Sequence, residues 1–325
     1  MKLHKVNKNM LVKSLVLLFM CLMLICPGAS FRGASSGLLL WFHNVLPNLL
    51  PFIILSNLIV RLNITRQISK IFYPLLGKLF RISYEGCYPI VIGFLSGIPM
   101  GAKSTADLVQ ENKINRKEAQ FLLGMCNNAS PMFIIGYIAI TQLKHPNINY
   151  ALFIIIYGAS ILGSIIFRYF FSLSDKISEA NQVNTAAKNN SATFKRFSFE
   201  LLDNSIMNGF EIVTKIGGYI ILFSIIAQII KEIGPETSFI KATLMGILEI
   251  TTGISQVCVT TMDIKMKIVL VCTLTTFGGF SAVAQTKSVL GDSRLSIYSY
   301  IIVKLISAIL ALLFSLLYIS LFYHA

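Results

Sequence analysis

The chain has 325 residues, of which 55% are hydrophobic and 13% are charged, and its mean hydropathy is +0.72. An average soluble domain carries about 25% charged residues, and apolar runs of about 20 residues, long enough to cross a hydrocarbon core, recur along this chain. These properties exclude a soluble globular protein, a disordered chain and a secreted disulfide scaffold. The sequence predicts an all-α, multi-pass membrane protein.

The 28 Lys and Arg residues exceed the 14 Asp and Glu residues and give a formal net charge of +14. Basic residues gather in the cytoplasmic loops of membrane proteins, and no aromatic–basic interleaving typical of a nucleic-acid surface occurs, so we expect no nucleic-acid partner. The six cysteines form no C-x-x-C pair, and the four histidines have no metal-ligand spacing. We therefore expect no metal and no cofactor.

The N-terminal segment, residues 1–37, is predicted to hold a signal-anchor transmembrane helix. Four lysines precede an apolar stretch from Ser14 to Cys26 that small residues follow, and a cleaved signal peptide has this layout. The stretch from Leu11 to Ser30 is also long enough for a first span, which favours an uncleaved anchor. Cleavage of the segment stays open.

Six further spans and two interrupted apolar stretches follow. The interrupted stretches, Cys87 to Ala102 and Phe239 to Val259, contain glycine and polar residues, so we interpret each as a re-entrant helical hairpin. The predicted spans are Leu38 to Val60, Gln120 to Thr141, Tyr150 to Phe171, Ile206 to Ile230, Ile268 to Gln285 and Ile297 to Phe322.

The basic residues support one orientation of these spans. With the N-terminus inside, 20 of the 28 Lys and Arg residues fall in cytoplasmic segments, six fall outside, and Lys215 and Lys304 fall within spans. Residues 62–83 place basic and apolar positions at helical spacing, which predicts a helix lying on the inner leaflet. A short loop followed by a poor span is the alternative.

The order of elements repeats along the chain. Residues 38–172 and 205–325 each contain a span, a broken hairpin, a broken span and a plain span, and the polar residues 173–204 join them as a cytoplasmic linker. Each half crosses three times, so we expect the second repeat to be inverted relative to the first. Inverted halves with matched breaks are typical of secondary transporters that bind substrate near the midplane.

In the first repeat, glycines and polar residues interrupt both apolar stretches. A glycine-rich turn followed by a lysine and hydroxyls, as in residues 93–105, allows a ligand to approach the backbone closely. The adjacent amides of Asn127 and Asn128 would be costly in hydrocarbon unless they face a cavity or another helix. A lysine that extends to the headgroups, and amides that join helices, are the structural alternatives. The candidate substrate-binding residues here are Gly97, Gly101, Lys103, Ser104, Thr105, Asn127, Asn128 and Ser130.

In the second repeat, a carboxylate and a glycine pair interrupt the apolar stretches. An intramembrane carboxylate indicates proton coupling or pairing with a cation, and a structural ion pair is the alternative. Glu211 and Lys215 have the spacing of a structural pair on one helix. The candidate substrate-binding residues here are Glu249, Thr251, Thr252, Gly278, Gly279, Ser281 and Gln285.

Catalytic machinery is not apparent in the sequence. It shows no Ser-His-Asp set, no paired carboxylates and no glycine-rich nucleotide loop, and it has no room for the soluble module of an ATP-driven pump. We therefore expect a protein that is not an enzyme.

Six ordered motifs resemble the YlbJ-type sporulation integral membrane proteins, part of the wider nucleoside-recognition Gate group, and they cover nearly the whole chain from about residue 38 onward. The motifs are Trp41 to Ser56, Gly93 to Leu108, Asn127 to Gly136, Lys215 to Phe223, Gly246 to Gly253 and Phe277 to Gln285.

The resemblance implies a role in endospore formation, in the cell membrane or the outer forespore membrane of a spore-forming bacterium, and makes the two halves Gate repeats. Members include the protein that moves dipicolinic acid across the outer forespore membrane. The wider group looks related to concentrative nucleoside transporters, which use inverted repeats and re-entrant hairpins. A planar dianion such as dipicolinate would suit Lys103 and the N-terminal dipoles of the hairpin helices.

Three hypotheses for the function follow. The first is a secondary transporter of a small organic anion, dipicolinate above others, coupled to H+ or Na+ in the lipid bilayer. The second is a nucleoside or nucleobase permease, and the third is a non-transporting membrane scaffold in spore formation. The coupling ion and the formation of a homo-oligomer stay open at this point.

Overall fold

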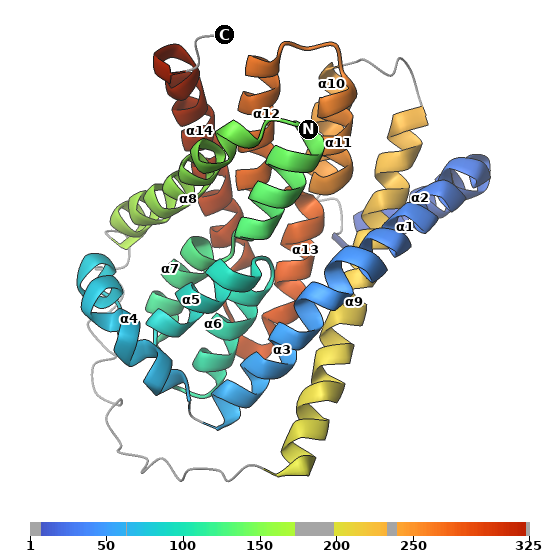
Figure 1. Cartoon of the computed structure of the whole chain (residues 1–325). Helices are drawn as coiled ribbons and strands as arrows, with labels where there is room; N and C mark the ends of the chain where they lie inside the picture. The colour runs from blue at the N-terminus through green and yellow to red at the C-terminus, as the bar shows by residue number, and fades with distance from the viewer. Residues whose placement is uncertain (1–7, 63, 173–197, 233–238, 323–325) are drawn as a thin grey trace, which may run out of the picture.

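The computed structural model describes residues 8–62, 64–172, 198–232 and 239–322, all helices, turns and loops without a strand in these ranges (Figure 1). The helices of the first half are α1 (Lys8–Ile25), α2 (Pro27–Leu40), the π-helical η1 (Trp41–Val45), α3 (Leu46–Arg61), α4 (Thr65–Phe80), α5 (Cys87–Ser96), α6 (Met100–Gln110), α7 (Arg116–Cys126), the π-helical η2 (Phe133–Gln142), η3 (Pro146–Ile148) and α8 (Asn149–Ser172). Those of the second half are α9 (Phe199–Glu232), α10 (Phe239–Leu248), α11 (Ile250–Val259), α12 (Ile264–Phe277), α13 (Gly279–Val289), η5 (Gly291–Ser293) and α14 (Ile297–Phe322).

The predicted all-α membrane fold is confirmed. In the described part of the chain, four helical runs, residues 146–170, 199–232, 264–289 and 297–322, are long and apolar enough to cross a membrane. The number rises to six if each of two strongly bent helix pairs counts as one span. The chain is therefore a multi-pass integral membrane protein.

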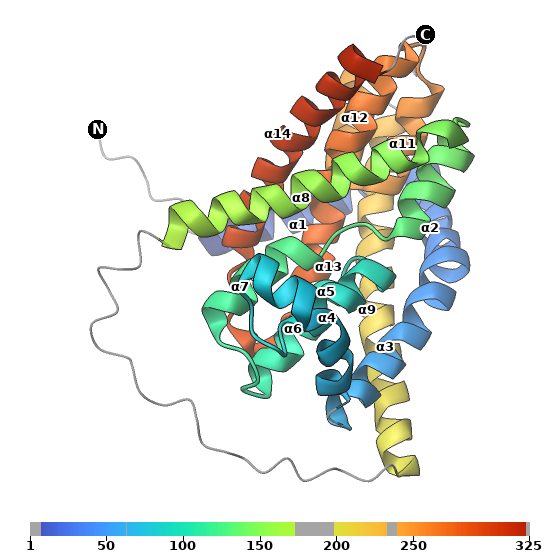
Figure 2. The same cartoon turned by 60° about the vertical axis from the view of Figure 1, so that its left-hand side comes forward.

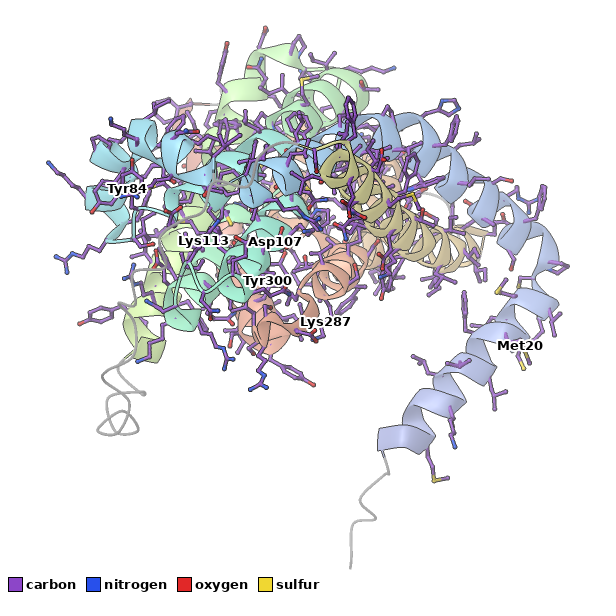
Figure 3. The ribbon with its side chains drawn as sticks, turned by 90° about the horizontal axis from the view of Figure 1, so that it is seen from below. Met20, Tyr84, Asp107, Lys113, Lys287 and Tyr300 are labelled. Atoms are coloured by element: carbon purple, nitrogen blue, oxygen red, sulfur yellow. The ribbon has the colours of Figure 1, made fainter. Side chains whose placement is uncertain are left out.

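The first predicted span does not form one straight helix. A bend of 105° separates α1 from α2, at the step from Cys26 to Pro27. Proline lacks the backbone N–H of a helix interior and its ring clashes with the preceding turn, so residues Leu11 to Ser30 do not form the one straight helix that was expected; the signal-anchor role of residues 1–37 remains a prediction. Figure 3 shows α1, marked by Met20, projecting away from the bundle, and most of its apolar side chains are exposed.

Helix α2 packs along α9 through a row of small residues. A Cβ added to Gly33 would lie 2.7 Å from the Cα of Ile225, and one added to Gly37 would lie 2.9 Å from the Cα of Ile221. Small residues four positions apart let two helix backbones approach closely, as in many membrane proteins. This contact fixes the N-terminal part of the chain to the second half (Figure 2).

Both predicted hairpins exist. Helices α5 and α6 pack against each other around the turn at Gly97, and α10 and α11 pack around Glu249. The two helices of the second hairpin lie very close to each other at Gly246 and Gly253, since a Cβ on Gly253 would lie 2.1 Å from the Cα of Gly246. Only glycine allows this approach.

The two predicted broken spans are also interrupted where expected. Helix α7 ends at Cys126 and η2 begins at Phe133, while α12 and α13 meet at Gly278, which has a φ of +86°. Glycine adopts this left-handed backbone at low cost. Both halves thus contain a hairpin, a broken helix and a long helix in the same order; the inverted orientation of the second half remains a prediction.

Two segments differ in extent from the prediction. Helix α9 begins at Phe199, so residues 199–204 of the expected linker are helical, whereas residues 173–197 of that linker lie outside the described residues. Helix α4 turns by 95° from α3, as a helix along the membrane surface would. Its basic and apolar residues occupy different faces.

The two halves of the chain pack against each other. Helix α8 contacts α14 and α12, and α3 contacts α9. One apolar core lies among α3, α5, α6, α7 and α9, and a second lies among η2, α8, α11, α12 and α14. Helices of both halves therefore contribute to each core.

Candidate functional site

The break between α7 and η2 contacts both α13 and α14 through Asn127. Its Nδ2 donates to Thr286 Oγ1 at 2.8 Å and to Tyr300 OH at 2.9 Å, and its Oδ1 accepts from Ala102 N at 3.3 Å. Asn127 is fully buried. One amide of the first half therefore joins α6 to two helices of the second half.

The neighbouring amide contacts a lysine. Asn128 Nδ2 donates to the Met125 carbonyl at 2.7 Å, and Asn128 Oδ1 accepts from Lys304 Nζ at 2.6 Å. Lys304 lies on α14 and is 1% exposed. The two predicted amides thus face the second half, and the lysine that meets them is one that the sequence analysis placed merely within a span.

The hairpin α5–α6 rests on the end of α7. A Cβ on Gly93 would lie 2.1 Å from the Cys126 carbonyl oxygen, and a Cβ on Gly101 would lie 2.3 Å from the same oxygen. Gly97 has a φ of +79°, and its added Cβ would lie 2.8 Å from Ser130 N. The predicted glycines therefore admit the backbone of the neighbouring break, not a ligand, in this conformation.

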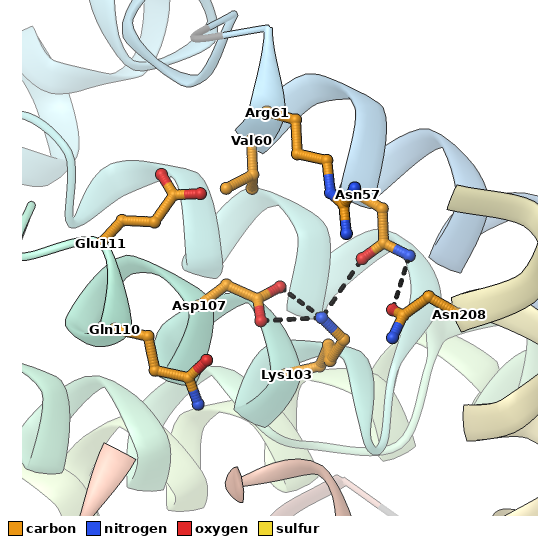
Figure 4. A pocket seen from close by; sticks show the side chains of 8 residues that line it. All are labelled: Asn57, Val60, Arg61, Lys103, Asp107, Gln110, Glu111 and Asn208. Carbon is orange, nitrogen blue, oxygen red and sulfur yellow. Dashed lines mark hydrogen bonds and ion pairs between the residues drawn. The ribbon is translucent and has the colours of Figure 1, made fainter. Parts of the chain in front are cut away.

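Lys103 lies apart from the amides and is paired. Its Nζ donates to Asp107 Oδ1 at 2.7 Å and to Asn57 Oδ1 at 3.2 Å. Asn57 Nδ2 in turn donates to Asn208 Oδ1 at 2.9 Å. These residues border a cavity of about 220 Å³ (Figure 4), lined by Asn57, Val60, Arg61, Lys103, Asp107, Gln110, Glu111 and Asn208.

The predicted hydroxyls of α6 bond locally. Ser104 Oγ donates to the Met100 carbonyl at 2.8 Å, and Thr105 Oγ1 donates to the Gly101 carbonyl at 2.7 Å. Both are carbonyls of α6 itself. Ser130 Oγ accepts from Phe133 N at 3.2 Å and so caps η2. In this conformation these three hydroxyls stabilise helix ends and turns.

Glu249 occupies the N-terminus of α11. Its Oε1 accepts from Thr251 N at 3.0 Å, and its Oε2 accepts from Thr252 N at 2.8 Å and from Thr252 Oγ1 at 2.6 Å. A carboxylate at this position stabilises the free N–H groups and the positive end of the helix dipole. The protein thus places its own anion where a substrate carboxylate was expected to bind.

The second hairpin also contacts the first half. Tyr137 OH on η2 donates to the Thr251 carbonyl at 2.9 Å. Within the second half, Gly279, with a φ of +78°, lies against the last carbonyls of α10. Between the halves, the Ile98 side chain lies 3.5 Å from a Cβ added to Gly278. Gln285 Nε2 donates to Ser281 Oγ at 3.1 Å within α13. The turn of the first hairpin therefore lies against the break between α12 and α13, and η2 lies against the second hairpin.

The structure therefore divides the predicted site residues into three groups: the amides with Lys304, the Lys103 cavity, and the Glu249 cap. The sequence analysis missed Lys304, Tyr300 and Thr286, and it missed Asn57 and Asp107 beside the cavity. The signal for Lys304 was available, because it is the one charge in an otherwise apolar span from Ile297 to Phe322. The predicted Glu211–Lys215 pair is confirmed at 2.6 Å.

Metal chemistry has no evident site in the described ranges, where no group of three or more His, Cys, Asp or Glu residues is arranged to hold an ion. The groups that the breaks offer are amides, hydroxyls, one lysine and free backbone N–H groups. Such groups bind and orient a polar solute.

Comparison with known proteins agrees with these observations. Residues 42–144 match the Gate family, described as nucleoside recognition. The chain is 28% identical, over an alignment of 354 positions, to the sporulation integral membrane protein YlbJ of Bacillus subtilis (strain 168), and the alignment covers 98% of this chain and 84% of that relative. No solved structure matches the chain. The resemblance indicated by the six motifs is thereby confirmed: the chain is similar to a YlbJ-type sporulation integral membrane protein over nearly its whole length and carries a Gate segment in its first half.

Proposed function

We propose that this protein is a secondary transporter that moves a small organic anion across a membrane during spore formation, with dipicolinate as the favoured substrate. The observation that carries the proposal is the contact between two interrupted helices, α7–η2 and α12–α13, where Asn127 donates to Thr286. Interrupted helices are tolerated within a membrane where they are buried in protein or line a cavity. In transporters they hold the substrate.

The name of the Bacillus subtilis relative supports the link to sporulation. The buried Lys304 beside the first break favours an anion over a cation. The outer forespore membrane is the location that this proposal assigns to the protein.

The test is flux into proteoliposomes. Purified protein is reconstituted, and uptake of radiolabelled dipicolinate is measured against protein-free liposomes, under an imposed pH gradient and separately under a Na+ gradient. Saturable dipicolinate uptake supports the proposal, and the gradient that drives it identifies the coupling ion. In cells, forespores of a deletion strain should lack dipicolinate while the mother cell still makes it; normal core dipicolinate would overturn the assignment.

A nucleoside or nucleobase permease is the second candidate. The match of residues 42–144 to a family described as nucleoside recognition favours it, and the amides and carboxylates around the 220 Å³ cavity could bond to a ribose or a base. Radiolabelled uridine in the same liposomes separates the two. Uridine uptake without dipicolinate uptake would establish the permease, and uptake of neither would favour a scaffold.

A further inference from the structure

Lys304 is a buried lysine without a carboxylate paired to it among the described residues. Its ammonium group has three N–H donors, and its hydrogen bond is the one to Asn128 Oδ1, at 2.6 Å. The Tyr300 ring centroid lies 5.6 Å away. Among the described residues no carboxylate forms an ion pair with it. An uncompensated charge inside a membrane protein is costly and marks a functional position.

The chain next to Lys304 presents backbone donors that lack acceptors. Between the end of α7 at Cys126 and the start of η2 at Phe133, the backbone N–H groups of residues 127–130 donate to no acceptor within the part of the chain that the structure describes. Asn127 and Asn128 are at most 2% exposed. Free N–H groups of an irregular segment are available to an anionic acceptor.

Two buried hydroxyls near this break also lack a partner. Ser307 lies one turn after Lys304 on α14, and Ser160 lies on the adjacent α8; both side chains are fully buried, and neither Oγ has a hydrogen-bond partner among the described residues. A Cβ on Gly163, one turn after Ser160, would lie 3.1 Å from the Cα of Ser307. The surroundings of Lys304 therefore have an excess of N–H donors over charged acceptors among the described residues.

From this excess we infer that Lys304 and the backbone of residues 127–130 form the site that binds a carboxylate group of the transported anion. The inference rests on the proposed function and names the site at which that function would act. It replaces Lys103 in this role, because Lys103 already forms an ion pair with Asp107.

The experiment measures binding to purified protein in detergent at fixed salt. The probes are dipicolinate with two carboxylates, picolinate with one, and pyridine with none. The first variant is Lys304→Gln. Its matched control is the double variant Lys103→Gln/Asp107→Asn, which removes the other lysine together with its counter-ion and so leaves no unpaired charge behind.

Wild-type protein should bind dipicolinate and, more weakly, picolinate, and should not bind pyridine. Lys304→Gln should weaken dipicolinate binding about 30-fold, since it removes a charge-assisted contact, and the double variant should stay within about threefold. The unfolding midpoint of ligand-free Lys304→Gln should equal or exceed that of wild type, because the substitution removes a buried unpaired charge. A merely structural lysine would give a lower midpoint.

A second variant, Asn128→Asp, supplies within the protein the carboxylate that Lys304 lacks. It places a carboxylate next to Lys304 Nζ, at the loss of the Asn128 Nδ2 hydrogen bond to the Met125 carbonyl, so it should abolish dipicolinate binding. Wild-type affinity in both Lys304→Gln and Asn128→Asp would overturn the inference. If wild type still transports dipicolinate in that case, the proposed function stands; if wild type neither binds nor transports it, both fail.

Discussion

Lys103 and Lys304 are both buried lysines, but the charges around them differ. Lys103 lies on α6, which follows the turn of the first hairpin, and Lys304 lies on α14, beside the break between α7 and η2. Lys103 is 8% exposed, borders a cavity and is neutralised by Asp107, one helical turn away on the same helix. Lys304 is 1% exposed and bonds to a neutral amide from the other half. A lysine with its counter-ion in place contributes to the fold, whereas one without a counter-ion is available to an incoming anion.

The strongest test of this contrast is Asp107→Asn. The substitution leaves Lys103 buried without a counter-ion, and breaking a buried pair in this way costs about 3 kcal/mol. The midpoint of thermal unfolding should fall clearly below that of wild type, and Lys103→Gln added to Asp107→Asn should restore most of the loss. A stable single variant would show that Lys103 tolerates the absence of an anion as we infer for Lys304.

A second test concerns the glycine contact that holds the two lysine regions together. Gly101 is on the helix of Lys103, and its Cα lies against the Cys126 carbonyl that precedes the amides. In Gly101→Ala the new Cβ would lie 2.3 Å from that oxygen, so we expect a loss of about 2 kcal/mol from overpacking.

The matched control for this substitution is Gly218→Ala, at an exposed position of α9 with no atom within 4 Å of the new Cβ. It should leave stability unchanged or raise it by about 0.5–1 kcal/mol through helix propensity. Equal effects of the two substitutions on the unfolding midpoint would refute the close contact between α6 and the end of α7.

A smaller effect is expected from Tyr300→Phe. Tyr300 OH accepts from Asn127 Nδ2 at 2.9 Å, and removal of the hydroxyl costs about 1 kcal/mol as one buried hydrogen bond is lost. Combining Tyr300→Phe with Asn127→Ala in a double-mutant cycle measures the coupling between the halves. Additive losses would mean that this amide does not join the break to α14.

The smallest effect is expected at the exposed pair on α9. Glu211→Gln removes a salt bridge whose side chains are more than half exposed, and such pairs contribute little to stability because solvent screens them. The unfolding midpoint should change little, and the change should vanish at high salt. A loss as large as that of Asp107→Asn would contradict the distinction between buried and exposed pairs.

The sequence by itself determined the architecture of this protein to a large extent. Hydrophobic runs, glycines and prolines indicated the spans of α8, α9 and α14, both hairpins and both broken helices, because these features depend on local backbone chemistry and on the length needed to cross a membrane. The predicted span from Leu38 to Val60 is divided between two bent helix pairs. Helix α14 has the bounds predicted for it, Ile297–Phe322. The bend at Pro27 was missed, although its cause is equally local, because the length of the apolar run was given more weight.

Only the tertiary structure decided which polar residues meet. Asn128 and Lys304 are 176 positions apart in the chain, and no pattern in either segment specifies that contact. Lys103 was expected to be available for substrate, yet Asp107 and Asn57 engage it, and Glu249 was expected to pair with a cation or carry a proton, yet it caps its own helix. The state of a buried charge depends on the partners that packing brings to it, because inside a membrane no water can take their place.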